Sequence, residues 1–102
     1  MLIVKYHDVV WDDGNRGKCE KHGVSIAEIE ALLRQPDLWV APDVGHSQRE
    51  KRHLAVGKLQ SGRYVFMAFA LRGGFVRPIS ARFMHKKEIR QYEAEIAGNK
   101  NG

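Results

Sequence analysis

The chain has 102 residues, of which 43% are hydrophobic and 28% charged, and this length and composition are typical of one soluble globular domain. Its apolar runs fall far short of the roughly 18 residues that span a bilayer, which excludes a membrane-spanning helix. The N-terminal residues lack the layout of a secretion signal, so we expect a cytoplasmic protein. The single cysteine, Cys19, excludes an internal disulfide framework, and we expect no chemical role for it.

The net charge of +5 is distributed unevenly along the chain. Residues 1–50 contain six Lys or Arg and nine Asp or Glu, a net charge of −3, whereas residues 51–102 contain eleven and three, a net charge of +8. Six of those eleven residues are arginines, whose planar guanidinium suits bidentate contacts with phosphate. The distribution predicts a nucleic-acid partner, with a merely solvated basic surface as the alternative.

The first third of the chain predicts a strand and two helices. Apolar runs at residues 2–4 and 9–11 indicate a first strand or a small bent hairpin, with Trp11 in the core. Asp12 or Asp13 is expected to cap a short helix over residues 15–21. Ser25 and Glu28 have the spacing of a capping box, and the apolar residues at positions 26, 29, 32 and 33 predict a helix that ends near residues 34–35.

The middle of the chain predicts a sheet. Residues 38–41 indicate a short strand, and a polar loop follows over residues 42–51. Residues 52–59 and 63–71 predict two further strands, and the near-continuous apolar run of the second indicates a central strand covered on both faces. After a tight turn at residues 72–74, the last strand is expected over residues 75–83, with Pro78 at an edge or a bulge.

A final helix is expected over residues 84–97, with an apolar stripe, a stop at Gly98 and a frayed tail over residues 99–102. The stripe consists of Ile89, Tyr92 and Ile96, which we interpret as packing residues. The whole pattern predicts an α+β fold: a small antiparallel sheet of four to five strands, with two N-terminal helices and one C-terminal helix packed on one of its faces.

The junction between the last strand and the last helix is unusually basic. It brings Arg82, His85, Lys86 and Lys87 within six residues, where the helix N-terminus is already partly positive. Each lysine in that first turn costs about 0.3–1 kcal/mol of stability. A fold tolerates such a cost most readily where the positive potential binds a polyanion, so this junction is the first candidate site.

Several short motifs occur together, in a fixed order, over about residues 9–93. They are Trp11-Asp12 with Asn15, then Lys21-His22-Gly23-Val24-Ser25, Arg52 with Leu54-Ala55-Val56-Gly57, Gly62-Arg63-Tyr64-Val65-Phe66, Arg77 with Ile79-Ser80-Ala81-Arg82, and Lys86-Lys87-Glu88 with Tyr92. In this order and spacing they resemble the BrnT family of toxins from type II toxin–antitoxin systems. The resemblance implies a RelE-like fold and metal-independent cleavage of RNA without a cofactor. It also implies a neighbouring antitoxin with a ribbon-helix-helix DNA-binding domain.

RNA cleavage of this kind requires proton transfer and charge stabilisation around the phosphate, which histidine or lysine and arginine can supply. The candidate catalytic residues are Arg82, His22, Lys21, His85 and Arg72; the candidate RNA-binding residues are Arg52, Arg63, Lys86 and Lys87. Arg82 leads this set, because the resemblance and the junction both select it. In a regular strand Arg82 would share a face with Ser80 and Pro78, and Arg77 would lie on the opposite face.

Other interpretations remain open. Arg82 could form an ion pair with Asp12 or Asp13. His22 could be a capping or a satisfied core histidine, and His85 could be an N-terminal helix cap. A non-catalytic module that binds RNA or only its antitoxin is the main alternative function, whereas a DNA-binding regulator lacks a recognition-helix pattern. We expect no metal site, because the remaining histidines are too scattered: His7, His46 and His53.

Overall fold

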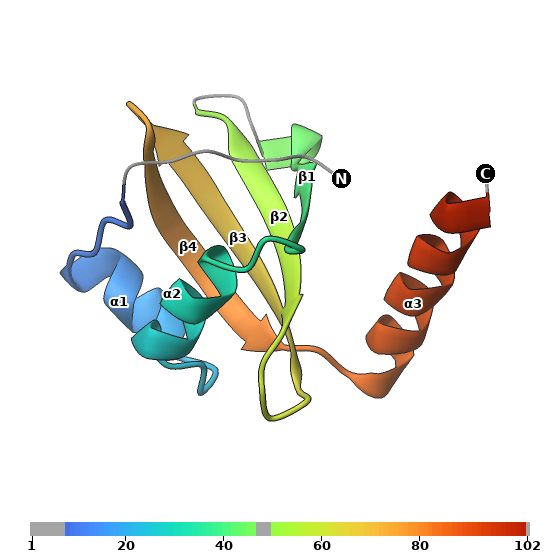
Figure 1. The fold of residues 1–102 in the computed structure, drawn as a ribbon. Helices are drawn as coiled ribbons and strands as arrows, with labels where there is room; N and C mark the ends of the chain where they lie inside the picture. The colour runs from blue at the N-terminus through green and yellow to red at the C-terminus, as the bar shows by residue number, and fades with distance from the viewer. Residues whose placement is uncertain (1–7, 47–49, 102) are drawn as a thin grey trace.

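The structure, a computed structural model, describes residues 8–46 and 50–101. Two short helices are followed by four strands and a long C-terminal helix (Figure 1). The apolar run at residues 2–4, predicted as part of a first strand, lies outside the described residues, as does His7. The run at residues 9–11 forms no strand of its own, because Val9 makes only an isolated parallel bridge with Val76. The sheet of the described residues therefore has four strands.

Helix α1 (Asp13–Glu20) starts directly after its cap, Asp12. The Asp12 side chain accepts the Asn15 N–H (3.0 Å), and Asn15 Oδ1 accepts the Asp12 N–H (2.7 Å), which completes a capping box. Asn15 is buried, and its amide nitrogen donates to the main-chain carbonyls of Val10 (2.9 Å) and Pro78 (3.0 Å). Asn15 thus ties α1 to the last strand. Cys19, later in the same helix, is fully buried, and burial raises the pKa of its thiol to about 11.

Helix α2 (Ile26–Leu33) begins at the predicted capping box. Ser25 Oγ accepts the Glu28 N–H (3.1 Å), and Glu28 Oε1 accepts the Ser25 N–H (2.9 Å). The helix approaches the sheet so closely that a Cβ added at Gly57 would lie 2.6 Å from Leu32 Cδ2. Glycine at that position therefore permits the close packing of α2 on the sheet.

The sheet is antiparallel, with the strand order β1-β2-β3-β4. The strands are β1 (Trp39–Pro42), β2 (Arg52–Lys58), β3 (Tyr64–Arg72) and β4 (Phe75–Phe83), with a 3₁₀ turn (Val44–His46) after β1. The tight turn between β3 and β4 is confirmed: Gly73 (φ 57°) and Gly74 (φ 85°) both have positive φ, as a type I′ hairpin requires.

A bulge in the β3–β4 pairing changes which residues of β4 share a face. Arg82 pairs with Phe66 and Ser80 with Ala68, but the register shifts after Ala68, so Arg77 pairs with Ala70. The extra residue resets the alternation of side chains. The prediction that Arg77 and Arg82 lie on opposite faces is therefore wrong, while the bulge expected near Pro78 is confirmed.

The two faces of the sheet differ in what covers them. The packed face carries the buried row Val40, Ala55, Met67 and Ala81 under α1 and α2. The other side, called here the open face, carries the rows Trp39–Val56–Phe66–Arg82, Leu54–Ala68–Ser80 and Arg52–Ala70–Arg77. Phe66 and Ala68 are only half-buried there, whereas Ala70 is fully buried, so the prediction that the central strand is covered on both faces holds only in part.

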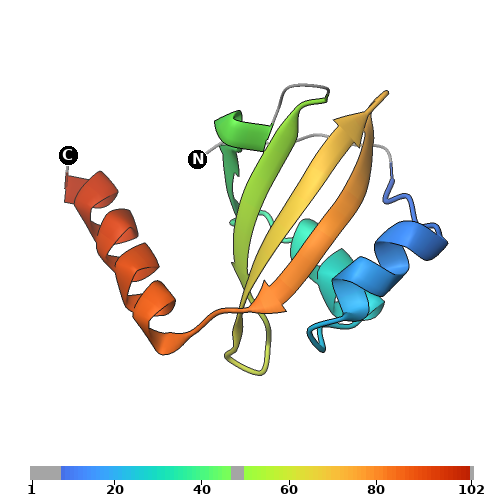
Figure 2. The same cartoon turned by 180° about the vertical axis from the view of Figure 1, so that it is seen from behind.

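Helix α3 (Lys86–Asn101) does not join the other two helices, although all three were predicted on one face. It projects from the end of β4 and stands away from the sheet, on the other side from α1 and α2 (Figures 1 and 2). The Tyr92 ring makes edge contacts with Trp39 (6.1 Å between centroids) and Tyr64 (5.8 Å). The helix also continues through Gly98, so the predicted stop at that glycine is wrong and residues 99–101 are helical.

Candidate functional site

Arg82 lies on the open face near the end of β4, where its guanidinium is 4.9 Å from the centre of the Phe66 ring. Its Nη1 and Nη2 each donate to one carboxylate oxygen of Glu88, both at 2.7 Å. The alternative ion pair of Arg82 with Asp12 or Asp13 does not form, because Arg82 pairs with Glu88 and Asp12 pairs with Arg77. The Arg82 side chain remains 38% exposed, so a ligand can reach it from solvent.

Glu88 connects Arg82 to the start of α3. Besides the two bonds to Arg82, its Oε1 accepts the backbone N–H of His85 (3.0 Å). The hydrogen bonds from Arg82 are the main reason why the pKa of Glu88 falls to about 2, and the same contact raises the pKa of Arg82. Glu88 therefore stays ionised at neutral pH and fixes the direction of the Arg82 guanidinium.

The basic residues predicted at the junction of β4 and α3 lie close together. His85 directly precedes α3, and its carbonyl accepts the first helical hydrogen bond, from the Ile89 N–H (3.0 Å). The His85 backbone N–H binds Glu88, its side chain is exposed, and the exposed Lys86 and Lys87 form the first turn of the helix. His85 thus occupies the cap position of the helix, as one interpretation of the sequence expected.

Lys21 and His22 lie apart from this cluster, in the exposed turn after α1. A Cβ added at the next residue, Gly23, would lie 3.9 Å from the Phe83 ring, which places this turn beside the end of β4. The Arg63 guanidinium lies 3.4 Å from the centre of the Phe83 ring. Arg63 and the turn that holds Lys21 and His22 are thus near Phe83, which follows Arg82 in β4 but packs against the core on the other face.

Arg52 and Arg72 are not near Arg82. Arg72 is six residues along β3 from Phe66, the partner of Arg82, which corresponds to about 20 Å at roughly 3.3 Å per residue. There they line a cavity of about 220 Å³, called here the arginine pocket, whose charged residues are Lys18, Glu50, Arg52, Arg72 and Arg77. The candidate residues therefore divide between two ends of the open face.

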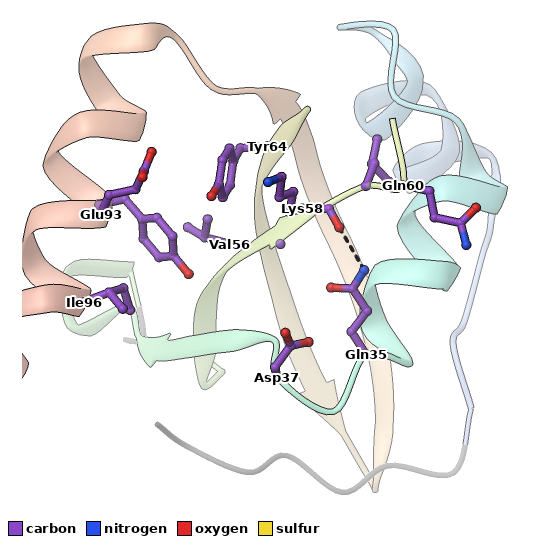
Figure 3. A pocket seen from close by; sticks show the side chains of 11 residues that line it. Gln35, Asp37, Val56, Lys58, Gln60, Tyr64, Glu93 and Ile96 are labelled. Atoms are coloured by element: carbon purple, nitrogen blue, oxygen red, sulfur yellow. Dashed lines mark hydrogen bonds between the residues drawn. The ribbon is translucent and has the colours of Figure 1, made fainter. Parts of the chain in front are cut away.

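A second hollow separates α3 from the sheet (Figure 3). Its volume is about 670 Å³, and Tyr64 of β3 and Glu93 and Ile96 of α3 lie on one side of it. Opposite them, Gln35 Nε2 donates to the Lys58 carbonyl (2.9 Å). With Phe66 and Tyr64 on the same face, aromatic rings thus continue from Arg82 into this groove.

Three of the site residues were not selected from the sequence. Phe66 and Tyr64 could not be assigned to the face of Arg82, because strand register is invisible in a single sequence. Glu88 could have been found, since His85 and Glu88 have capping-box spacing. Chemically, the open face offers a fixed guanidinium near an exposed histidine and aromatic rings, a combination suited to a phosphate and a base.

The comparison with known families agrees with this chemistry. Residues 11–88, more than half of the chain, match the model of a family described as "Ribonuclease toxin, BrnT, of type II toxin-antitoxin system". The matched range ends at Glu88 and therefore includes Arg82 and His85. No curated protein matches the chain. Among the described residues, no helix is both long and apolar enough to cross a lipid bilayer.

Proposed function

The chain belongs to the BrnT family of ribonuclease toxins from type II toxin–antitoxin systems, and from this premise we propose that it cleaves RNA without a metal ion, through the 2′-hydroxyl of its substrate. The observation that carries this proposal is the Arg82 guanidinium, which is oriented by Glu88, half-exposed and beside His85. A phosphate at this point would meet a fixed positive charge. The proposal includes a RelE-like fold and a ribbon-helix-helix antitoxin as the partner in the cytoplasm.

The reaction needs three tasks. A base removes the proton of the 2′-hydroxyl, and the freed oxygen forms a bond to phosphorus. The bond between phosphorus and the 5′-oxygen breaks, and an acid protonates that oxygen, which gives a 2′,3′-cyclic phosphate and a 5′-hydroxyl end. In the proposal Arg82 stabilises the charge that builds up on the phosphate oxygens.

His85 is the favoured group for proton transfer, because histidine can act as a general acid or base and the backbone N–H of His85 binds the Glu88 carboxylate that orients Arg82. Lys21 and His22 remain candidates for the second proton transfer, from the turn beside Phe83. Lys86, Lys87 and Arg63 would bind the flanking phosphates.

The decisive experiment compares the wild-type chain with Arg82→Ala on a structured RNA in the presence of EDTA. We expect wild-type fragments that end in cyclic phosphate, and a rate about 10²–10³ lower in the variant, the usual loss when one donor to the charged transition state is removed. Arg90→Ala is the matched control, because Arg90 is an exposed arginine of α3.

Equal cleavage by the wild type and Arg82→Ala would contradict the role of Arg82. Activity that EDTA abolishes would contradict the metal-independent mechanism. If both proteins bind RNA with a steep dependence on salt but cut nothing, the chain is a non-catalytic binding module.

A further inference from the structure

The arginine pocket lies where the open face meets α1 at the edge strand β4, and its Arg77 is close enough to Arg82 for one nucleic-acid strand to bridge the two. Arg82 pairs with Phe66, and Arg77 of the pocket pairs with Ala70, four residues further along β3. At roughly 3.3 Å per residue these two rows are about 13 Å apart. An extended strand covers that distance with a few nucleotides.

The pocket retains positive charge although two of its arginines have acidic partners. Arg72 donates from Nε (2.7 Å) and Nη2 (3.2 Å) to Glu50, and Arg77 pairs with Asp12. Lys18, exposed on α1, adds a charge that no carboxylate matches among the described residues. Lys18, Arg72 and Arg77 together exceed the carboxylates of Glu50 and Asp12 by one charge.

The dimensions and donor groups of the pocket fit a phosphate. Its volume of about 220 Å³ is several times the share of one water molecule, roughly 30 Å³. A guanidinium has five N–H donors, so Arg72 and Arg77 retain donors beyond those that bind Glu50 and Asp12. The acidic partners thus hold the arginines in place and still leave them able to bind an anion.

The surface between the two ends is also suited to a strand. Ala68 and Ser80 form the row between Arg82 and Arg77, and their small side chains leave the face flat. Phe66 lies half-buried beside Arg82 and offers a ring on which a base can stack. Cations along the path of the strand, together with an aromatic ring on which a base can stack, are the usual construction of a site for single-stranded nucleic acid.

We propose that the arginine pocket is a second phosphate site, which binds the substrate strand a few nucleotides away from the phosphate held by Arg82. This inference rests on the proposed function and narrows its substrate to single-stranded RNA long enough to reach both ends of the open face. A strand bound at two points gains affinity once its length spans them, because the second contact becomes intramolecular.

The test measures binding of single-stranded 2′-deoxy oligonucleotides of increasing length, which lack the nucleophilic hydroxyl and cannot be cleaved. Wild-type affinity should rise steeply once the strand reaches both sites. Lys18→Ala should weaken the long strands roughly two- to fivefold, the size of one exposed charge contact, and leave the shortest strands unaffected. The slope of log K against log salt should fall by about 0.7.

Glu50→Gln should change the affinity for long strands in the opposite direction from Lys18→Ala. It releases Arg72 from its carboxylate partner, so the long strands should bind roughly two- to fivefold more tightly. Arg16→Ala is the matched control, since Arg16 is an exposed cation of the same helix that does not line the pocket.

Equal losses in Lys18→Ala and Arg16→Ala would overturn the second site, because they would reduce it to a general effect of charge. Unchanged strand binding in both Lys18→Ala and Glu50→Gln would also overturn the second phosphate site. An acidic protein would then be the ligand of the arginine pocket. A chain that shows the length dependence but cuts no RNA would overturn the proposed cleavage and retain the second site.

Discussion

Phe66 and Phe69 lie three residues apart on β3, and their surroundings differ in almost every respect. Phe69 is 2% exposed and stacks on His53 (5.3 Å between centroids) within the packed face. Phe66 lies half-buried on the open face, next to the Arg82 guanidinium. One strand thus supplies both the core and the ligand surface, because its side chains alternate between the two faces. In this small protein the division between stability and function runs through the sheet itself.

The largest expected effect is on the free energy of unfolding, and it differs between a substitution on the packed face and one on the open face. Phe69→Ala should lower the free energy of unfolding by about 3–5 kcal/mol, because it leaves a cavity in the core. Phe66→Ala should cost only about 1–2 kcal/mol, since the ring is half-buried, but should weaken single-stranded RNA binding by about 1–3 kcal/mol. Urea unfolding and fluorescence anisotropy measure the two quantities. Equal destabilisation by both variants would contradict the division of the faces.

A second prediction concerns the contact between α2 and the packed face. Gly57→Ala should destabilise the protein by about 1–3 kcal/mol, because the new methyl group would press on Leu32 in a filled core. Gly17→Ala is the matched control: nothing lies within 4 Å of its added Cβ, and alanine is the better helix residue by about 1 kcal/mol. Thermal unfolding should shift in opposite directions for the two variants, and a gain in stability from Gly57→Ala would refute the close approach.

The smallest effect is on pH dependence, and it also differs between the faces. Burial lowers the pKa of His53 on the packed face, so the unfolded chain binds its proton first and stability should fall as the pH drops below about 6.5. Asp12 and Glu88, paired with Arg77 and Arg82, both have a pKa of about 2, and their ordinary values are 3.8 and 4.5. Their stabilisation is complete above those values and is lost as the pH falls towards 2.

Unfolding midpoints measured from pH 8 to pH 2 would separate the two contributions. His53→Gln should flatten the upper part of the profile, and Glu88→Gln or Asp12→Asn the lower part. The lower part should be shallow, because these carboxylates are solvent-exposed and the solvent screens their ion pairs. A steep lower part that Glu88→Gln leaves unchanged would contradict the assignment.

Local signals predicted the local structure well. Both N-terminal helices begin at the caps that Asp12 and Ser25 supply, and the Gly73-Gly74 pair fixes the last hairpin. These features depend on residues close together in the chain, so the sequence alone contains them. The same holds for the basic first turn of α3.

Features that depend on register and packing could not be predicted. The bulge moves Arg77 to the face of Arg82, and one inserted residue is enough to invalidate an argument from alternation. The ion pair between Glu88 and Arg82 joins a helix to a strand, and Tyr92 connects α3 to the sheet through its contact with Trp39. Only tertiary structure determines such contacts.

The buried amide of Asn15 has a consequence for the solubility of the protein. β4 is an edge strand, and an exposed edge can recruit strands from other molecules and start aggregation. Here the Val76 N–H donates to the Asp8 carbonyl, and the Val76 carbonyl accepts the Val10 N–H. The Asn15 side-chain amide donates to the Pro78 carbonyl, and Pro78 has no backbone N–H. Around residues 76–78 the outer edge of the sheet is therefore closed to another copy, so the residue that anchors α1 also protects the chain from fibrous self-association.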